Sequence, residues 1–262
     1  MERYFIILEL WKNVMNSNDF NSLGERIADD DIYLNKKFPK EPKEIFKPII
    51  SLIENCKFQS GFNLCDIGCA TGEFLAHAQN VFPHCNISGI DFSKSLIEEA
   101  KKNIPTGNFF VKSIEEKNAL GKRKFDVINM KGVLTIFDDP RPILLNCLSA
   151  MKKNGLLLVT NFFNEDPIDV LVRYRRADKK NSPLEKGWNM HSCFTIEEQL
   201  RNSDYDLEIN WHDFVMPFPI KRGDDPMRTW TTQVGNSKNI SINGACQIIN
   251  FKILEIRIKD FF

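Results

Sequence analysis

The sequence predicts an α/β fold in which helices cover both faces of a doubly wound, mostly parallel sheet with an antiparallel C-terminal strand. Three observations support this prediction. From about residue 58, short apolar runs alternate with amphipathic helical segments. A glycine-containing turn joins the first such run to a helix, and the second run ends in Asp91. A chain of 262 residues with 42% hydrophobic residues can bury one sizeable core, so we expect one main domain over residues 58–262.

Residues 1–57 precede the first predicted strand and show helical periodicity in two places. The apolar positions are Phe5, Leu8, Trp11 and Val14, followed by Ile45, Ile49, Leu52 and Ile53. The first run contains Glu9 and lacks a small-residue cleavage site, which indicates an amphipathic helix and no export signal. We therefore expect a helical cap ahead of the sheet.

The predicted strands of the core follow at regular intervals. They span residues 62–67, 86–90, 109–111, 125–130 and 156–160. The first helix begins near Glu73, the second has Ser93 as its N-cap, and the third spans about 140–151. The pair Asn154-Gly155 then separates this third helix from the fifth strand.

The pattern is less regular beyond the fifth strand. It favours a helical piece around 168–176, a short helix from Thr195, and strands at 207–215 and 246–258. Two insertions, at about 162–205 and 216–245, are too long for tight connections. Long connections in compact domains are often functional, so we expect them to close over a site.

Composition and charge exclude several classes of protein. Lys plus Arg and Asp plus Glu both number 35, so the basic surface of a nucleic-acid-binding protein is absent. No stretch approaches the roughly 20 apolar residues of a membrane-spanning helix. The cysteines, an odd number of seven, indicate reduced thiols and a cytoplasmic location, with Cys65, Cys147 and Cys246 buried in apolar runs.

Metal sites are also disfavoured by the sequence. Cys65 and Cys69 lie four positions apart, but no second Cys or His pair follows at zinc-site spacing. The pairs Asp138-Asp139 and Asp224-Asp225 suggest turns more than a divalent-ion site, because nothing else completes a ligand set.

The segment Leu64–Phe74 carries the main functional signal. Small residues at 68, 70 and 72 let the backbone turn sharply at the carboxyl end of the first strand and approach a ligand closely. Asp91 ends the second strand 19 positions after Gly72, where a carboxylate can bind both hydroxyls of a ribose. Asp66 would repel the pyrophosphate of a dinucleotide but attract an α-ammonium group.

This arrangement resembles motif I of the class I methyltransferases that use S-adenosylmethionine (SAM), with Ala70 in place of the commonest glycine. The likeness extends over roughly residues 60–160 and implies a Rossmann-like fold. It assigns the methionine end of SAM to Asp66, Gly68, Ala70 and Gly72, the ribose to Asp91, and the adenine to Phe92, Ser113 and Ile114. Ser113 departs from the aspartate often found there, and Thr135 and Ile136 replace the histidines that many relatives carry.

Residues for the acceptor are harder to predict. His191 and His212 are the best candidates for a base, although each also suits a packed or surface histidine. Arg173, Arg176 and Lys180 recur at helical spacing and can bind phosphate or carboxylate, or form a solvated basic face. The aromatic residues that can wall the pocket, or pack into the core instead, are Tyr33, Trp188 and Trp230.

The resemblance implies a SAM-dependent methyltransferase that methylates a small acceptor at oxygen and releases S-adenosylhomocysteine (SAH). A sugar, sugar nucleotide or phosphorylated metabolite is the expected acceptor, as in bacterial surface-polysaccharide pathways. One alternative is a SAM-binding regulatory or partner subunit without catalysis. Another is an NAD-dependent oxidoreductase, which the spacing of the glycines disfavours.

Overall fold

A seven-stranded sheet forms the centre of the computed structural model, which describes residues 30–35, 38–39, 41–233 and 239–261. The strand order is β3-β2-β1-β4-β5-β11-β8. Neighbouring strands from β3 to β5 run parallel, whereas β11 is antiparallel to both β5 and β8. The strand bounds are β1 Asn63–Ile67, β2 Asn86–Asp91, β3 Asn108–Val111, β4 Phe125–Lys131, β5 Met151–Phe162, β8 Tyr205–Phe214 and β11 Phe251–Phe261. The predicted doubly wound sheet with an antiparallel C-terminal strand is confirmed.

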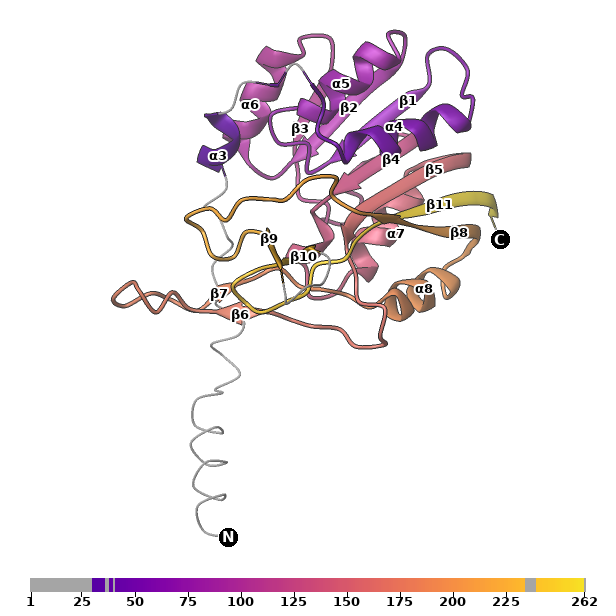
Figure 1. Ribbon diagram of the computed structural model, residues 1–262. Helices are drawn as coiled ribbons and strands as arrows, with labels where there is room; N and C mark the ends of the chain where they lie inside the picture. The colour runs from indigo at the N-terminus through magenta and orange to yellow at the C-terminus, as the bar shows by residue number, and fades with distance from the viewer. Residues whose placement is uncertain (1–29, 36–37, 40, 234–238, 262) are drawn as a thin grey trace.

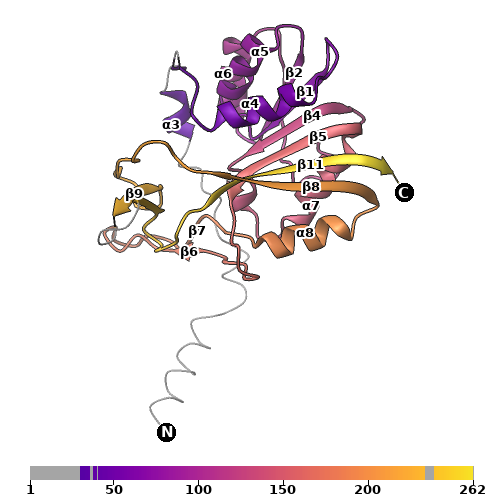
Figure 2. The same ribbon diagram turned by 45° about the vertical axis from the view of Figure 1, so that its right-hand side comes forward.

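Helices cover both faces of this sheet (Figures 1 and 2). One face is covered by α4, α5 and α6, and the other by α7 and α8. The helix bounds are α3 Asp30–Leu34, α4 Phe46–Asn55, α5 Glu73–Val81, α6 Lys94–Asn103, η1 Leu134–Ile136, α7 Arg141–Ser149 and α8 Cys193–Arg201. Ser93 caps α6, as predicted, because its hydroxyl accepts a hydrogen bond from the Leu96 amide.

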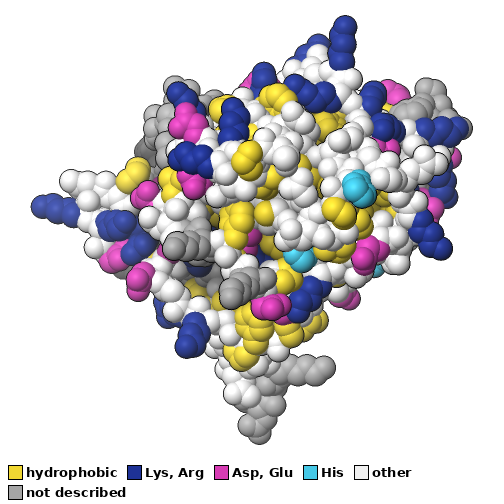
Figure 3. All heavy atoms as spheres, turned by 90° about the horizontal axis from the view of Figure 1, so that it is seen from above, with side chains coloured by type: hydrophobic (Ala, Val, Ile, Leu, Met, Phe, Trp, Pro, Cys, Tyr) yellow, Lys and Arg dark blue, Asp and Glu magenta, His cyan; other side chains and the backbone are white. Residues whose placement is uncertain are grey.

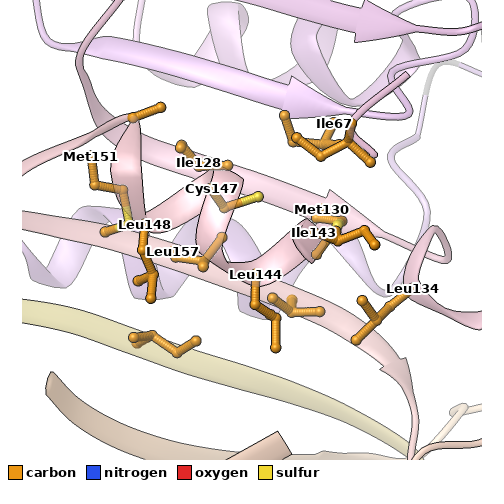
Figure 4. Close-up of a cluster of buried hydrophobic side chains, with 14 of the residues drawn as sticks. Ile67, Ile128, Met130, Leu134, Ile143, Leu144, Cys147, Leu148, Met151 and Leu157 are labelled. Atoms are coloured by element: carbon orange, nitrogen blue, oxygen red, sulfur yellow. The ribbon is translucent and has the colours of Figure 1, made fainter. Parts of the chain in front are cut away.

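Strand alternation divides the buried side chains between two cores. In β4, Ile128 and Met130 face α7, while Val127 faces the helices of the opposite layer. Figure 4 shows Ile128 and Met130 among side chains of α7 and β5, where Cys147 and Leu157 are fully buried. The near-continuous apolar character of the central strands follows from burial on both faces.

The N-terminal region is described only in part. The apolar positions 5–14 lie outside the described residues. The second predicted helix is α4, and its Phe46, Ile49 and Ile53 are buried in the core of the α5–α6 side. Helix α3 lies against α6, because Asp30 Oδ2 accepts hydrogen bonds from the hydroxyls of Ser93 and Ser95.

The helix expected around 168–176 does not form, and that prediction was wrong. The segment is extended: Val170 pairs with Met190, and the short strands β6 Arg173–Tyr174 and β7 Glu185–Lys186 form a hairpin that projects from the molecule (Figure 1). Backbone pairing with a distant segment therefore overrides the local helical spacing. Consequently the basic side chains of residues 173–180 do not share a helical face.

The second insertion contains another hairpin, formed by β9 Trp230–Gln233 and β10 Asn239–Ile242. Strand β11 begins at Phe251, five residues later than predicted, because residues 243–247 form a turn. Cys246 lies in this turn with a φ of 59° and is exposed, so its predicted burial was wrong. Cys65 and Cys147 are fully buried, as expected.

The described part of the chain contains no helix that is long and apolar enough to span a membrane. Likewise, no group of three or more His, Cys, Asp or Glu side chains in this part is arranged to hold a metal ion. Seen over the α5–α6 side, basic and acidic side chains are interspersed (Figure 3), in keeping with a formal net charge of zero.

Candidate functional site

A cavity of about 400 Å³ opens at the carboxyl ends of the parallel strands. It extends from the ends of β2 and β3, across β1, to the loop after β4 and the segment 186–188. Helix α3 closes one side through Asp30 and Tyr33. The strand order reverses between β1 and β4, and ligands of open α/β sheets bind at this switch point.

The turn after β1 brings the backbone to the cavity wall. Gly68, Ala70 and Gly72 all have positive φ angles, of 67°, 47° and 89°. At Gly68 a Cβ atom would overlap Cγ2 of Val133, a stiff β-branched side chain. The amides of Gly68 and Cys69 both donate to the Ile90 carbonyl, which fixes the turn against β2. Glycine is therefore required sterically at position 68.

Asp91 is buried at the carboxyl end of β2 and lines the cavity. Its Oδ2 accepts a hydrogen bond from the Ala70 amide at 2.9 Å, and its Oδ1 accepts one from the Ser93 amide at 2.9 Å. Burial raises the pKa of this carboxyl, and the two amides oppose that rise. Each carboxylate oxygen retains a further lone pair for a ligand hydroxyl.

Asp66 lies on β1 beside Asn129 of β4, which donates to Asp66 Oδ1 at 2.6 Å. Burial raises the pKa of Asp66 to about 7, although Asn129 and Lys131 act in the opposite direction. A cation placed next to Asp66 would favour its ionised form. Asp66 itself is buried and does not line the main cavity. Its predicted interaction with an ammonium group would therefore be indirect.

The end of the cavity near β2 and β3 is lined by all three residues predicted to contact the adenine. Phe92 is half-exposed, Ser113 lies at the surface of the wall, and Ile114 is buried. The Ser113 amide donates to Glu116, which orders the turn after β3. The structure therefore brings Phe92, Ser113 and Ile114 together with Asp91, although they come from different loops.

The opposite end is formed by the loop after β4 and the segment 186–188. Arg173 Nη2 lies 2.6 Å from Asp138 Oδ2, and the Asn189 side chain donates to Asp138 Oδ1 at 2.9 Å. Burial raises the pKa of Asp138, but Arg173 and Asn189 outweigh it and leave the pKa below its ordinary value. These contacts join the β4 loop to the β6–β7 hairpin, with Lys186 and Trp188 exposed to the cavity.

Neither histidine predicted as a base lines this cavity. His191 is buried behind the wall, where Nε2 lies 3.0 Å from the Phe137 carbonyl and Nδ1 has no partner among the described residues. His212 lies on edge strand β8, 2.7 Å from Glu255 of β11. Their positions depend on the packing of the first insertion for His191 and on the pairing of β8 with β11 for His212, which residue type alone does not reveal.

Two of the three aromatic residues that were predicted to wall the pocket do line the cavity. Tyr33 and Trp188 line the cavity, whereas Trp230 lies outside it. The guanidinium group of Arg222 lies over the Trp230 ring. Sequence reasoning missed Lys131 and Lys186. Lys131 could have been found as a charged residue directly after the apolar pair at the end of the fourth predicted strand and directly before Gly132.

A comparison with protein families identifies the family of this chain. A family described as a methyltransferase domain matches residues 58–212, which is more than half of the chain. The chain belongs to the class I SAM-dependent methyltransferases. A dinucleotide-dependent oxidoreductase is thereby excluded as the family.

Curated relatives agree with this family. The chain is 26% identical over 145 residues to a malonyl-[acyl-carrier protein] O-methyltransferase of Bacillus anthracis, covering 55% of this chain and 53% of the relative. It is 29% identical over 94 residues to a demethylmenaquinone methyltransferase of Thermotoga maritima, covering 36% and 41%. The chain thus spans about half or less of the length of these relatives.

Solved structures share the fold. The YcgJ protein of Bacillus subtilis matches with a TM-score of 0.55 at 16% identity, over 82% of this chain and 100% of that chain. Magnesium protoporphyrin IX methyltransferase from Synechocystis PCC 6803 with bound SAH matches with a TM-score of 0.51 at 12% identity, over 82% of each chain.

The residues at the cavity fit SAM, the donor that this family uses. The positive-φ turn brings the backbone of Gly68 and Ala70 to the cavity wall, and Asp91 presents a carboxylate suited to a ribose. The buried acceptor atoms Glu73 Oε1 and Asn129 Oδ1, which have no hydrogen-bond partner among the described residues, lie behind the cavity wall. Phe92 supplies an aromatic surface for a base.

Proposed function

We propose that this protein transfers the methyl group of SAM to a carboxylate oxygen of a small acceptor. The observation that carries the proposal is the chemistry of the cavity lining at the acceptor end. Among the described residues, this end offers apolar and aromatic surface from Ile136, Phe137 and Trp188, a cation at Lys186, and no histidine. A carboxylate acceptor is already deprotonated at neutral pH and needs no base.

The cofactor-binding residues keep their predicted roles in this proposal. Asp91 accepts from the ribose hydroxyls, Phe92, Ser113 and Ile114 contact the adenine, and the turn from Gly68 to Gly72 faces the methionine portion. When bound, SAM supplies an electrophilic methyl group on a sulfonium. The protein's task is therefore to align an acceptor oxygen with that group and to exclude water.

The walls of the acceptor end suit that task. Lys186 can pair with a negatively charged acceptor, since its Nζ lies 4.0 Å from Asp138 and retains donors. Tyr33 and Trp188 supply apolar surface over the cavity. His191 and Asn189 both hydrogen-bond the Phe137 carbonyl, so we assign them to holding the β4 loop in place.

The names of the relatives are consistent with a carboxylate. Besides the malonyl-[acyl-carrier protein] enzyme, a trans-aconitate 2-methyltransferase of Enterobacter is 27% identical over 128 residues. Both names describe methylation of an organic acid.

A sugar, sugar nucleotide or phosphorylated metabolite, as in a polysaccharide pathway, is the second candidate acceptor. Trp188, Asp138 and Asp139 all line the cavity, which favours this acceptor because aromatic faces and carboxylates together suit sugar rings. A hydroxyl acceptor needs proton removal, and Asp139 is the carboxylate available for that step. Lys186 would then bind a phosphate.

Free cysteines favour a reducing compartment for this chemistry. All seven cysteines are unpaired, including the exposed Cys246. We therefore propose the cytoplasm as the place of action.

Calorimetric titration and turnover test the proposal together. SAM and SAH should bind and NAD should not. Panels of organic acids, sugars and sugar nucleotides are then assayed by SAH release. A methyl ester releases methanol in mild base, whereas a methyl ether does not, so the product identifies the acceptor class. SAM binding without SAH release on any acceptor would favour a non-catalytic SAM-binding subunit instead.

A further inference from the structure

A basic hairpin, defined as residues 173–186, lies beside the acceptor end of the cavity. It contains six basic residues and two acidic ones, Asp178 and Glu185. Strands β6 and β7 pair at its base, and the rest projects from the molecule (Figure 1). Of its cations, the proposed function uses Lys186 only, so those nearer the tip have no role in it.

Both acidic side chains of the basic hairpin are already bound within it. Asp178 accepts from the Arg176 guanidinium through both carboxylate oxygens, at 2.8 and 2.6 Å. Glu185 accepts a hydrogen bond from the Tyr174 hydroxyl at 2.7 Å. The hairpin therefore offers no spare carboxylate to its other cations.

Three cations of the basic hairpin, Arg175, Lys179 and Lys180, are exposed. None of them forms a hydrogen bond or an ion pair with the described part of the chain. Asp178 acts on Lys179 electrostatically, but its two oxygens are bound to Arg176. The result is a surface of one sign of charge that can attract carboxylates.

The position of this surface limits what it can bind. Arg175, Lys179 and Lys180 do not line the cavity, whereas Lys186 and Trp188, at the base of the hairpin, do. An acceptor small enough to lie inside the cavity therefore cannot pair with the three cations. A body that pairs with them lies next to the cavity and is larger than the acceptor itself.

The base of the hairpin is fastened to the wall of the cavity. Arg173 Nη2 lies 2.6 Å from Asp138 Oδ2 in the β4 loop. The Gly187 amide donates to the Val172 carbonyl at 2.9 Å and closes the hairpin next to the paired strands. A surface that is already ordered loses little conformational entropy when a partner binds.

The chemistry of the hairpin favours a protein as the partner. Single-stranded nucleic acids are bound through stacking on aromatic side chains. Tyr174 is the one aromatic residue among 173–186, all of which are described, and it is half-buried with its hydroxyl bound to Glu185. Peripheral membrane segments insert apolar side chains, and none of the exposed large hydrophobic residues lies in this range. Carboxylates on a protein surface need neither feature.

We propose that the basic hairpin docks a partner protein with an acidic surface, and that this partner carries the acceptor as a tethered group. Arg175, Lys179 and Lys180 pair with carboxylates of the partner, while the tethered group enters the cavity at Lys186 and Trp188. Exposed charges of this kind speed up encounter and orient the partner. The inference rests on the proposed function, since it takes this end of the cavity as the place of methyl transfer.

Fluorescence anisotropy with a labelled oligo-glutamate peptide tests the docking surface without turnover. The wild-type protein should bind the peptide with an affinity that falls as the salt concentration rises. A hairpin variant that combines Arg175→Gln, Lys179→Gln and Lys180→Gln should bind it about 10-fold more weakly, the combined effect of three exposed ion pairs. SAH affinity should be unchanged in this variant and also reports that it is folded.

A second triple variant controls for net charge. It combines Lys101→Gln, Lys117→Gln and Lys122→Gln, which removes three exposed cations from outside the hairpin and the cavity. Its net charge equals that of the hairpin variant. It should bind oligo-glutamate like wild type, because these lysines do not belong to the docking surface.

Kinetics test whether the partner carries the acceptor. An organic acid that turns over is coupled to an oligo-glutamate peptide and, separately, to a neutral glycine–serine peptide. In the wild-type protein KM should be about 10-fold lower for the glutamate conjugate. In the hairpin variant the two conjugates should have the same KM, and KM for the free acid should be that of wild type.

Wild-type protein that does not bind oligo-glutamate would overturn the inference, as would an equal loss of affinity in the two triple variants. Tighter binding of oligo-uridylate or of phosphatidylglycerol vesicles would assign the hairpin to a nucleic acid or a membrane and overturn it too. Equal KM values for the two conjugates in wild type would refute the tethered acceptor. If no organic acid turns over, the proposed function fails, and the anisotropy results still decide the docking surface.

Discussion

The Ala70 amide donates a hydrogen bond to Asp91 Oδ2 at 2.9 Å and thereby joins the two segments that the sequence marks as cofactor-binding. Ala70 comes from the turn after β1, and Asp91 ends β2. Because the Ser93 amide holds the other carboxylate oxygen, Asp91 is fixed in place without a ligand. Such preorganisation lowers the entropic cost of binding.

Replacement of Asp91 by alanine should weaken SAH binding by about 10- to 100-fold, because a charged acceptor for the ribose hydroxyls is lost. Titration calorimetry measures this change. Asp126→Ala is the matched control: Asp126 also accepts from a backbone amide, that of Asn63, but at the amino end of β4. Both variants should lose stability, and only the Asp91 variant should lose affinity. Unchanged SAH affinity in Asp91→Ala would count against the site.

Ala70→Gly should stabilise the protein by about 1 kcal/mol, since Ala70 has a φ of 47° and a left-handed conformation strains any residue with a Cβ. Urea unfolding of the free protein measures the gain. Ala76→Gly, the same change inside α5, should lower the free energy of unfolding by about 1 kcal/mol. A destabilised Ala70→Gly variant would show that the Ala70 methyl group makes a contact that outweighs the strain.

Asp66 should make stability depend on pH. Its pKa is raised from 3.8 to about 7 in the folded protein, mainly by burial. The folded state therefore holds this proton more tightly than the unfolded state. The contribution of Asp66 to the free energy of unfolding is greatest below the unfolded pKa and is lost as pH rises toward 7. Asp66→Asn should flatten this slope and raise stability at pH 8 by on the order of 2 kcal/mol.

Urea unfolding of both proteins from pH 4 to 8 gives the comparison. An unchanged slope in Asp66→Asn would refute the pKa assignment. The same variant should bind SAH less tightly, because an amide is a weaker partner for an ammonium than a carboxylate.

Trp188→Ala should raise KM for the acceptor and leave SAH affinity within about twofold, because Trp188 lines the cavity at the end that we propose for the acceptor. Steady-state kinetics and calorimetry separate the two effects. Trp230→Ala is the control, since Trp230 lies outside the cavity, and its KM should be that of wild type. A loss of SAH affinity in Trp188→Ala would place Trp188 against the donor instead.

The core elements were predictable because their signals are local. The run Phe125–Met130 alternates between two buried faces, and Ser93 supplies a side-chain cap to the helix that follows it. The extended pairing of Val170 with Met190 was not predictable from spacing, because it depends on a partner 20 residues away. The same applies to His191, which lies behind the Phe137 carbonyl and not in the cavity.

The sequence by itself determined the strand–turn–helix at Asp66 to Gly72, the acidic end of β2 and the order of the core, because backbone conformation and hydrophobic periodicity are set by neighbouring residues. Only the tertiary structure decided which charged groups meet. It brought Lys131 beside Asp66 and Glu73, and it joined Arg173 to Asp138 across 35 positions of sequence. Electrostatic interactions depend on distance and burial in space, and neither is encoded by spacing along the chain.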